Sequence, residues 1–276
     1  MTPTIGVFDS GFGGLTVLRA LIERIPQAEF AFIGDTARLP YGSKSRRTIA
    51  RYAAQSARFL VEQQGAEFLV IACNTASALA LDAIQEAVPV PVLGVIQPGA
   101  TAARAASRTG DVLVIATDAT VQSHAYSTAC RALGLRALEK ACPLLVPLVE
   151  EGWTDHPVTT EVIEIYLNEL RVEAASQGMN PDTLLLGCTH YPLLRGLFEQ
   201  AVRPGAKVID SAEAAAEAAV QIFNGRLSLP GDPLSETPPN AKLRFFATDS
   251  VEKFERLGSR FLHHPVGKVE LVDLGG

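Results

Sequence analysis

Two cysteines occupy matching places in the chain, and both stand where a reactive thiol would be useful. Cys73 ends the run Phe-Leu-Val-Ile-Ala-Cys and Cys188 ends the run Thr-Leu-Leu-Leu-Gly-Cys, each after an acidic residue and before polar residues. Both cysteines are therefore expected at the end of a buried strand. A helix is expected to begin beside Cys73, where its amino end would favour a thiolate and offer N–H groups to a carboxylate. The alternative for a single cysteine is a small buried side chain in a sheet.

The pair of thiols suits racemisation if two similar halves of the chain face each other, so that the thiols flank one cleft. The reaction removes a proton from one face of a carbon and delivers one to the other, as two opposed acid–base groups can do directly. The surrounding protein can shift the usual thiol pKa of about 8.5 into the range that this role needs. His190 follows Cys188 by two residues and could lower or shuttle its proton. Zinc is the rival ligand, but Cys73, Cys188 and His190 lack zinc-finger spacing; Cys130 and Cys142 are interpreted as structural.

Two polar turns after strands are further candidates for substrate binding. Residues 9–14, Asp-Ser-Gly-Phe-Gly-Gly, would bring backbone N–H groups near an anion. The spacing is not G-x-G-x-x-G and no Walker lysine follows, so nucleotide binding is unsupported. The alternative is a tight turn in which Asp9 caps a helix. In the loop 35–43, Tyr41 and Gly42 could line a pocket, or the loop could be an ordinary surface loop.

Apolar runs alternate with helical patterns along the chain, which is typical of a buried parallel sheet. The predicted strands are Thr4–Phe8, Phe30–Gly34, Phe68–Ala72, Val92–Val95, Val112–Ala116, Thr183–Leu186, Lys207–Ile209, Leu243–Ala247 and Val269–Val272. The predicted helices are Leu15–Ile25, Arg46–Gln64, one after Asn74, Val121–Leu133, Val158–Ser176, Leu193–Val202, Ser211–Phe223 and one after Asp249, with a surface loop at 226–241. We therefore expect an α/β fold with two pseudosymmetric domains, each a mainly parallel sheet flanked by helices. The first domain is expected to comprise residues 1–97 plus 210–276 and the second residues 98–209.

Composition supports an ordinary globular protein of 276 residues. Hydrophobic residues make up 47% and charged residues 20%, and the formal net charge of −6 argues against a broad nucleic-acid-binding face. The apolar runs are of strand length, so no membrane segment is expected despite a mean hydropathy of +0.18. The first residues do not resemble a signal peptide, which makes the cytoplasm the expected location. Four cysteines without a C-x-x-C pair do not suggest a disulfide framework.

Four segments together resemble the glutamate racemase family, in the same order and over nearly the whole chain. They are Asp9-Ser10-Gly11 with Gly13-Gly14, Asp35-Thr36-Ala37-Arg38 with Pro40-Tyr41-Gly42, residues 72–77 (Ala-Cys-Asn-Thr-Ala-Ser), and residues 187–192 (Gly-Cys-Thr-His-Tyr-Pro). Aspartate racemases share the two-cysteine plan, but the surrounding motifs are more similar to the glutamate branch. The resemblance implies cofactor-independent interconversion of L- and D-glutamate in an interdomain cleft, supplying D-glutamate for peptidoglycan. It also implies a homodimer, which is common in the family.

The resemblance also implies roles for individual residues. Cys73 would deprotonate D-glutamate and Cys188 would deprotonate L-glutamate, with Asp9 and His190 assisting proton handling. A family glutamate matches Glu150, although adjacent Glu151 leaves the assignment open by one residue. The implied substrate contacts are Asp9, Ser10, Tyr41, Gly42, Asn74, Thr75, Thr117, Thr120, Thr189 and His190.

Neither pyridoxal phosphate nor a metal ion is implied, and the polar motif residues would supply the donors that a carbanion needs. The six lysines fall outside the motifs, which disfavours a pyridoxal Schiff base. One open alternative is a racemase for aspartate or another amino acid. The other is a two-domain binding protein that closes on an acidic ligand; the DNA gyrase inhibition reported for some family members would be a variant of this role.

Overall fold

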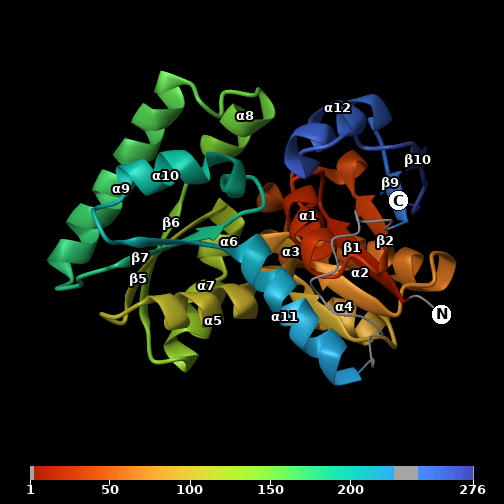
Figure 1. Ribbon diagram of the computed structural model, residues 1–276, viewed down its shortest axis with the longest axis horizontal. Coiled ribbons are helices and arrows are strands. Elements are labelled where there is room, and N and C mark those ends of the chain that lie inside the picture. Colours follow the sequence, from red (N-terminus) through yellow and green to blue (C-terminus); the bar gives the residue numbers. More distant parts are fainter. Residues whose placement is uncertain (1–2, 227–241, 276) are drawn as a thin grey trace. The chain divides into compact units, whose positions relative to one another are not determined.

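The structure is a computed structural model that describes residues 3–226 and 242–275 of the chain (Figure 1). The chain divides into two compact units: unit 1 comprises residues 1–95 and 215–276, and unit 2 comprises residues 96–214. The first boundary between the units lies two residues before the expected end at residue 97. The second lies five residues after the expected end at residue 209. Within the described ranges, no helix combines the length and the apolar character needed to cross a bilayer.

Unit 1 contains a six-stranded, wholly parallel sheet in the order β10-β9-β2-β1-β3-β4. The central strands are apolar because both faces of the sheet are covered; all six residues of β1 are buried. The strands are β1 (Thr4–Asp9), β2 (Glu29–Gly34), β3 (Phe68–Ile71), β4 (Val92–Gly94), β9 (Leu243–Ala247) and β10 (Val269–Leu271).

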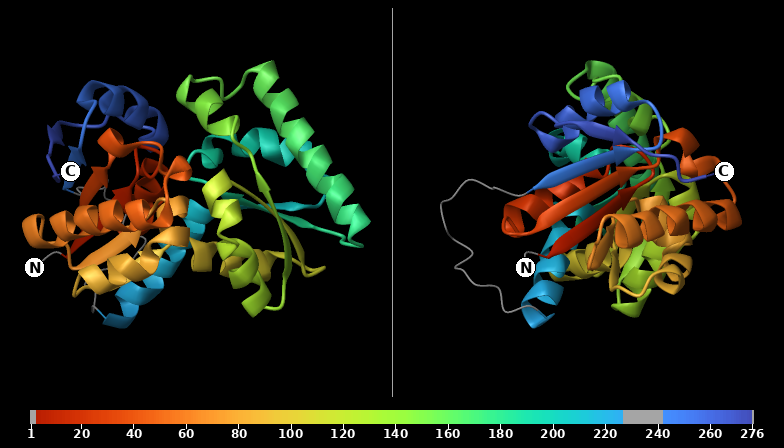
Figure 2. Two further views of the ribbon diagram at one scale, coloured as in Figure 1. Left: turned by 180° about the vertical axis from the view of Figure 1, so that it is seen from behind. Right: turned by 90° about the vertical axis from the view of Figure 1, so that its right-hand side faces the viewer.

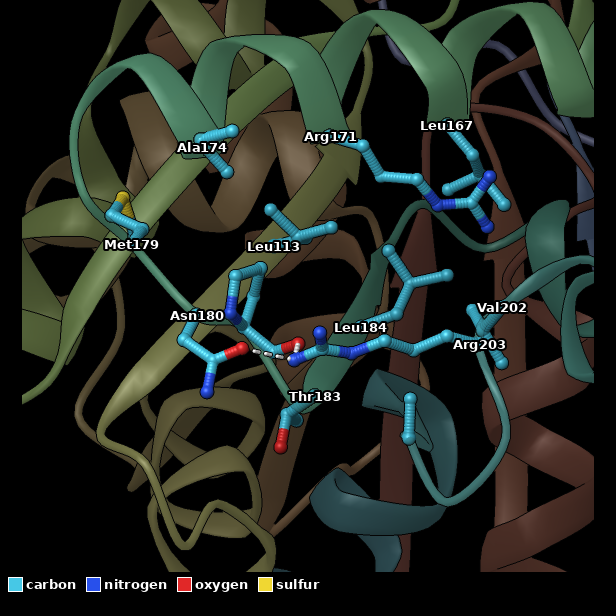
Figure 3. Close-up of a pocket in the computed structure, with 13 residues that line it drawn as sticks. Leu113, Leu167, Arg171, Ala174, Met179, Asn180, Thr183, Leu184, Val202 and Arg203 are labelled. Carbon is cyan, nitrogen blue, oxygen red and sulfur yellow. Dashed lines mark hydrogen bonds between the residues drawn. The ribbon is translucent and has the colours of Figure 1, made fainter.

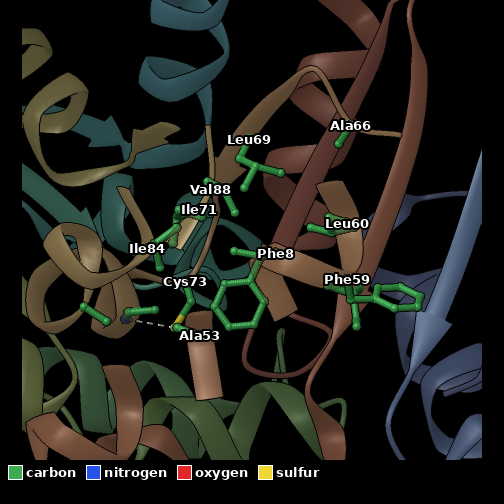
Figure 4. Packing of buried hydrophobic residues seen from close by; sticks show 14 of the residues in the cluster. Phe8, Ala53, Phe59, Leu60, Ala66, Leu69, Ile71, Cys73, Ile84 and Val88 are labelled. Carbon is green, nitrogen blue, oxygen red and sulfur yellow. Dashed lines mark hydrogen bonds between the residues drawn. The ribbon is translucent and has the colours of Figure 1, made fainter. Parts of the chain in front are cut away.

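Helices cover both faces of this sheet (Figure 2). The helices α1 (Leu15–Arg24) and α12 (Val251–Leu262) contact each other, and Phe254 of α12 packs on Phe32 of β2 with ring centroids 5.8 Å apart. The other face carries α2 (Arg46–Arg58), α3 (Asn74–Leu79) and α4 (Leu81–Ala87) over a buried cluster that includes Cys73 and Phe8 (Figure 4). The helix expected over 46–64 is present, but its last turn is a π-helical segment, η3 (Phe59–Gln63), which ends before Gly65 with φ of +70°.

Unit 2 contains a four-stranded parallel sheet in the order β6-β5-β7-β8. Its strands are β5 (Asp111–Ala116), β6 (Arg136–Ala141), β7 (Thr183–Gly187) and β8 (Lys207–Asp210). Its helices are α5 (Ile96–Ala106), α6 (Asp118–Gln122), α7 (Ala125–Ala132), α8 (Leu145–Glu150), α9 (Pro157–Ser176) and α10 (Arg195–Ala201), with the start of α11 (Ser211–Arg226).

Several elements of unit 2 were not predicted. The edge strand β6 was missed because its half-exposed sequence, Arg-Ala-Leu-Glu-Lys-Ala, carries charges and lacks an apolar run. The single helix predicted over 121–133 is wrong, because His124 at φ 53° separates α6 from α7. The short helix α8 and the helix α5 were also not anticipated. The predicted loop at 226–241 lies outside the described residues except for Arg226, which ends α11.

The two units share one strand order. In unit 1 the order β2-β1-β3-β4 places the first strand between the second and the third, and β6-β5-β7-β8 repeats this arrangement in unit 2. Both sheets therefore change winding direction between the first and third strands of the repeat. Ligands of open α/β sheets bind outside the carboxyl ends of the strands at such a point. The relevant strand pairs are β1 with β3, and β5 with β7.

Candidate active site

In unit 1, Cys73 lies at the carboxyl ends of β1 and β3. The backbone N–H of Cys73 donates to the Phe8 carbonyl of β1 at 3.4 Å, which holds the two strand ends together. The thiol donates to Ser10 Oγ at 3.3 Å. Cys73 also forms the N-cap of α3, and its sulfur accepts the backbone N–H of Ala76 at 3.4 Å. The predicted strand-end thiol beside a helix start is therefore present.

The surroundings keep the Cys73 thiol protonated. Burial and then the negative charge of Asp9 raise the pKa of Cys73 to about 12, although hydrogen bonds with Ser10 and Ala76 oppose the rise. The side chain is only 5% exposed, so water does little to stabilise a thiolate. In this state Cys73 is a proton donor rather than a base. The next two residues, Asn74 and Thr75, begin α3 and are also buried.

Asp9 is fixed by the glycine-rich turn. It is buried, and its Oδ2 accepts the backbone N–H of Gly11 at 2.9 Å. Gly14 packs so closely that a Cβ placed there would lie 2.6 Å from Asp9 Cβ and 2.8 Å from Ala72 Cβ. One glycine of this turn is therefore required for space. Helix α1 begins at Leu15, with Gly14 at its N-cap position.

Asp35, a residue for which no role was predicted, organises the loop that carries Tyr41 and Gly42. Its fully buried carboxylate accepts the Tyr41 hydroxyl at 2.6 Å and the Thr248 hydroxyl at 2.9 Å. Its backbone N–H donates to the Asp9 carbonyl at 3.0 Å. Burial and then the charge of Asp35 raise the pKa of Tyr41 well above its usual value. The only signal in the sequence was an acidic residue directly after a buried strand.

Tyr41 and Gly42 differ in their surroundings. The Tyr41 ring is buried and lies 6.2 Å from the Phe8 ring, centroid to centroid, so its body belongs to the core of unit 1. A Cβ placed on Gly42 would meet no atom within 4 Å. The loop therefore combines a fixed aromatic anchor with open space beside the following residue.

In unit 2, Cys188 follows β7 directly and stands beside a histidine–glutamate pair. His190 Nε2 lies 3.4 Å from Glu150 Oε1 at the end of α8, and His190 Nδ1 lies 3.4 Å from the Thr189 hydroxyl. Burial lowers the pKa of His190, but hydrogen bonds with Cys188 and Glu150, and their charges, raise it to about 10. A cationic imidazole beside a thiol favours the thiolate. Glu151 is exposed and follows the end of α8, so the carboxylate that contacts His190 belongs to Glu150.

Tyr191 fixes the turn after Cys188. Its buried hydroxyl lies 3.2 Å from the carbonyl of Ala116 and 3.1 Å from the carbonyl of Cys142, the residues at the ends of β5 and β6. The backbone N–H of Tyr191 donates to the Cys188 carbonyl at 3.2 Å. The sequence motif contained this tyrosine without indicating that it ties three strand ends together.

The turn after β5 carries the two predicted threonines. The hydroxyls of Thr117 and Thr120 lie 2.9 Å apart, and the backbone N–H of Val121 donates to the Thr117 carbonyl. Cys130 and Cys142 are buried, and burial raises their pKa values to about 11 and about 12. Within residues 3–226 and 242–275, no group of three His, Cys, Asp or Glu side chains is arranged to hold a metal ion.

The structure thus gathers the predicted residues into two half-sites, one in each unit. Unit 1 joins Asp9, Ser10 and Cys73 around the ends of β1 and β3, with Tyr41 attached through Asp35. Unit 2 joins Thr189, His190 and Glu150 around Cys188. Each half-site holds one thiol and at least one acid–base partner.

Comparison with known proteins gives one consistent result. Residues 5–219 match the family described as Asp/Glu/Hydantoin racemase. A glutamate racemase of Koribacter versatilis is 53% identical over 290 residues, covering 99% of this chain and 98% of that protein. The solved glutamate racemase isoform RacE1 from Bacillus anthracis has a TM-score of 0.87 at 38% identity, covering 99% of this chain and 98% of its own. The glutamate racemase from Francisella tularensis, solved in complex with D-glutamate, has a TM-score of 0.85 at 35% identity with the same coverages. The expected fold class, α/β with two parallel sheets flanked by helices, is confirmed.

Proposed function

Since the chain belongs to the Asp/Glu/hydantoin racemase family, we propose that its two half-sites interconvert L- and D-glutamate by two-thiol proton transfer at Cα. The activity is that of a glutamate racemase, an isomerase, and it implies a supply of D-glutamate for peptidoglycan. One observation supports the two-thiol mechanism: a buried cysteine beside an acid–base residue follows each of the equivalent strands β3 and β7. The mechanism requires both sulfur atoms to reach one substrate carbon.

In the L-to-D direction, the Cys188 thiolate takes the α-proton and forms an S–H bond. The electron pair of the broken C–H bond remains on Cα and spreads into the carboxylate. The Cys73 thiol then delivers its proton to the opposite face, leaving D-glutamate and a Cys73 thiolate. The two cysteines are then in the protonation states that the D-to-L direction needs. Proton exchange through Asp9, His190 or solvent returns the enzyme to its starting state.

The described protonation pattern suits the L-to-D direction. Because the pKa of Cys73 is about 12, this group carries a proton at neutral pH. Because the pKa of His190 is about 10, its imidazole is a cation beside Cys188. One side is thus prepared to donate a proton and the other to stabilise a thiolate.

The developing negative charge must be stabilised by groups already in place. Hydroxyl and amide groups of Ser10, Asn74, Thr75, Thr117 and Thr189 stand at the strand ends and are the proposed substrate contacts. Preorganised donors in a site that excludes water stabilise such an ion without reorganisation. Thr120 supports Thr117 through its 2.9 Å contact, and Gly42 leaves room for substrate.

Circular dichroism of L-glutamate tests the proposed activity. With purified enzyme and no added pyridoxal phosphate or metal ion, the signal should decay to zero as the racemate forms. L-aspartate measured in parallel distinguishes a racemase for aspartate, which would act faster on that substrate. A protein that binds glutamate tightly without changing the signal would instead be a binding protein, and the proposal would be wrong.

The assembly and location remain proposals. We propose a homodimer, as the family resemblance implies, and sedimentation analysis should show a species of twice the 29.4 kDa chain mass. A cytoplasmic location is proposed with it, and fractionation of cells expressing the protein tests that location.

A further inference from the structure

Unit 2 contains a pocket of about 290 Å³ at the end of its sheet opposite Cys188 (Figure 3). Its lining includes Leu113 of β5, Leu184 of β7 and Leu167 of α9. Thr183, the first residue of β7, also lines it, whereas Cys188 follows the last residue. Five residues of strand separate the two positions, or about 16 Å. The pocket is therefore separate from the candidate active site.

Two arginines line this apolar space. Figure 3 shows Arg171 extending from α9, and Arg203, from the segment after α10, reaching toward Asn180. Arg171 donates to the Ala201 carbonyl and, at 2.9 Å, to the Asn168 side-chain oxygen. Arg203 donates to the Asn180 side-chain oxygen and the Pro181 carbonyl, both at 2.7 Å. Each guanidinium is thus held in place by neutral oxygen atoms.

The local charge balance is positive. Neither Arg171 nor Arg203 has a carboxylate within 4.0 Å in the part of the chain that the structure describes. The two buried carboxylates at this end of the sheet each have a cation of their own. Asp111 pairs with Arg136 at 2.7 Å, and Asp182 lies 3.7 Å from the Arg108 guanidinium. The two pocket arginines therefore remain as uncompensated cations.

From this arrangement we propose that the pocket is a second ligand site, for a small molecule with an oxyanion head and a short apolar tail. Guanidinium groups match carboxylate and phosphate oxygens in geometry and charge. Leu113, Leu184 and Met179 offer the tail an apolar surface. The volume lies at the lower limit of small-molecule sites, so the ligand is smaller than a nucleotide sugar or a drug-sized compound.

The sequence provides a clean reporter for this site. The chain has two methionines, Met1 and Met179, and Met179 lines the pocket. Protein with ¹³C-labelled methionine methyl groups should give two NMR signals, and Met179→Leu assigns them by removing one. Titration with hexanoate, hexyl phosphate or hexan-1-ol then separates the roles of head and tail. L-glutamate, which carries carboxylates without an apolar tail, controls for ligand binding at the thiols.

We expect hexanoate, hexyl phosphate or both to shift the Met179 signal saturably, while hexan-1-ol and L-glutamate leave it in place at the same concentrations. A response to one anion alone identifies its head group as the preferred chemistry. The double variant Arg171→Gln/Arg203→Gln should weaken binding at least about tenfold. The double lysine variant keeps both charges and should bind more tightly than the glutamine variant. Arg131→Gln, an exposed change on α7, is the matched control and should bind as the wild type does.

Three results would overturn the proposal. They are the absence of a saturable shift with either anion, an equal shift with hexan-1-ol, and unchanged affinity in the double glutamine variant. Because Arg171 and Arg203 also contact backbone carbonyls, glutamate turnover and thermal unfolding of each variant are measured alongside. If the glutamine variant does not fold, the lysine variant provides a second test. Binding of the two anions to the lysine variant that is no tighter than binding of neutral hexan-1-ol would also refute the site.

Discussion

Replacing Glu150 with glutamine should lower the pKa of His190, and the structure gives the size of the effect. The pKa of His190 rises from 6.5 to about 10 against the opposing influence of burial. That rise corresponds to about 5 kcal/mol of preference for the charged form. Glu150 and Cys188 each supply one hydrogen bond and one charge, so Glu150→Gln removes about half of the favourable interactions. Because burial remains, the pKa should fall by about 2 units or more.

Titration of the histidine ring signals by NMR measures this pKa. The chain has five histidines, and His190→Gln identifies the relevant signal. Wild-type protein should show a His190 pKa of about 10, and Glu150→Gln should show about 8 or lower. Glu151→Gln is the matched control, since its side chain is exposed one residue away and should leave the titration unchanged. An unchanged His190 pKa in Glu150→Gln, or an equal shift in Glu151→Gln, would refute the reasoning.

The same change should alter pH dependence with a defined sign. A histidine whose pKa is raised on folding stabilises the fold fully below pH 6.5, and that contribution disappears as the pH rises through about 10. In Glu150→Gln the contribution should disappear as the pH rises through about 8, so the loss of stability relative to wild type should be full at neutral pH and should vanish as the pH rises through about 10. As the pH rises, racemisation should begin to decline at a lower pH in Glu150→Gln than in the wild type. Since the enantiomers have equal free energy, kcat/KM must fall equally in both directions.

Three further changes test separate parts of the structure. Gly14→Ala should destabilise the fold by about 1–3 kcal/mol and reduce turnover, because the new methyl group would collide with Asp9; unfolding in urea measures the loss, and a wild-type midpoint would contradict the packing argument. Tyr191→Phe should cost about 0.5–1.5 kcal/mol by removing the hydroxyl that links the Ala116 and Cys142 carbonyls, each of which keeps a backbone N–H donor, and unchanged thermal stability would show that the anchor is dispensable. Asp182, whose pKa is lowered to about 2 chiefly by backbone and side-chain hydrogen bonds that outweigh burial, should stabilise the fold above pH 3.8 by up to about 2 kcal/mol. Asp182→Asn should therefore lose stability at pH 6 and match the wild type near pH 2; a deficit that persists at low pH would contradict this.

The fold was predictable where apolar runs are buried on both faces. The strands β1 and β7 appear in the sequence as short apolar runs ending in polar turns, and their burial explains that pattern. Edge strand β6 was not predictable in this way, because a half-exposed strand needs no apolar run. The break at His124 was also hidden, since a residue with positive φ other than glycine leaves no clear mark in one sequence.

The two thiols of the candidate site could be proposed from the sequence, but the contacts that support their neighbours could not. Cys73 and Cys188 could be paired because their surrounding sequences repeat. The support that Asp35 gives Tyr41, and the position of Glu150 rather than Glu151 beside His190, depend on contacts between distant segments. Such contacts arise from tertiary packing, which residue types and spacing do not encode locally.

Exchange of the α-proton of glutamate in D₂O, measured separately on each enantiomer with single-cysteine variants, tests the two-thiol mechanism most directly. Cys73→Ser should exchange the α-proton of L-glutamate alone, and Cys188→Ser that of D-glutamate alone, while neither variant racemises. The wild type should exchange and racemise both enantiomers without added cofactor. Full racemisation by either variant, or exchange on both enantiomers with a single thiol, would contradict the mechanism.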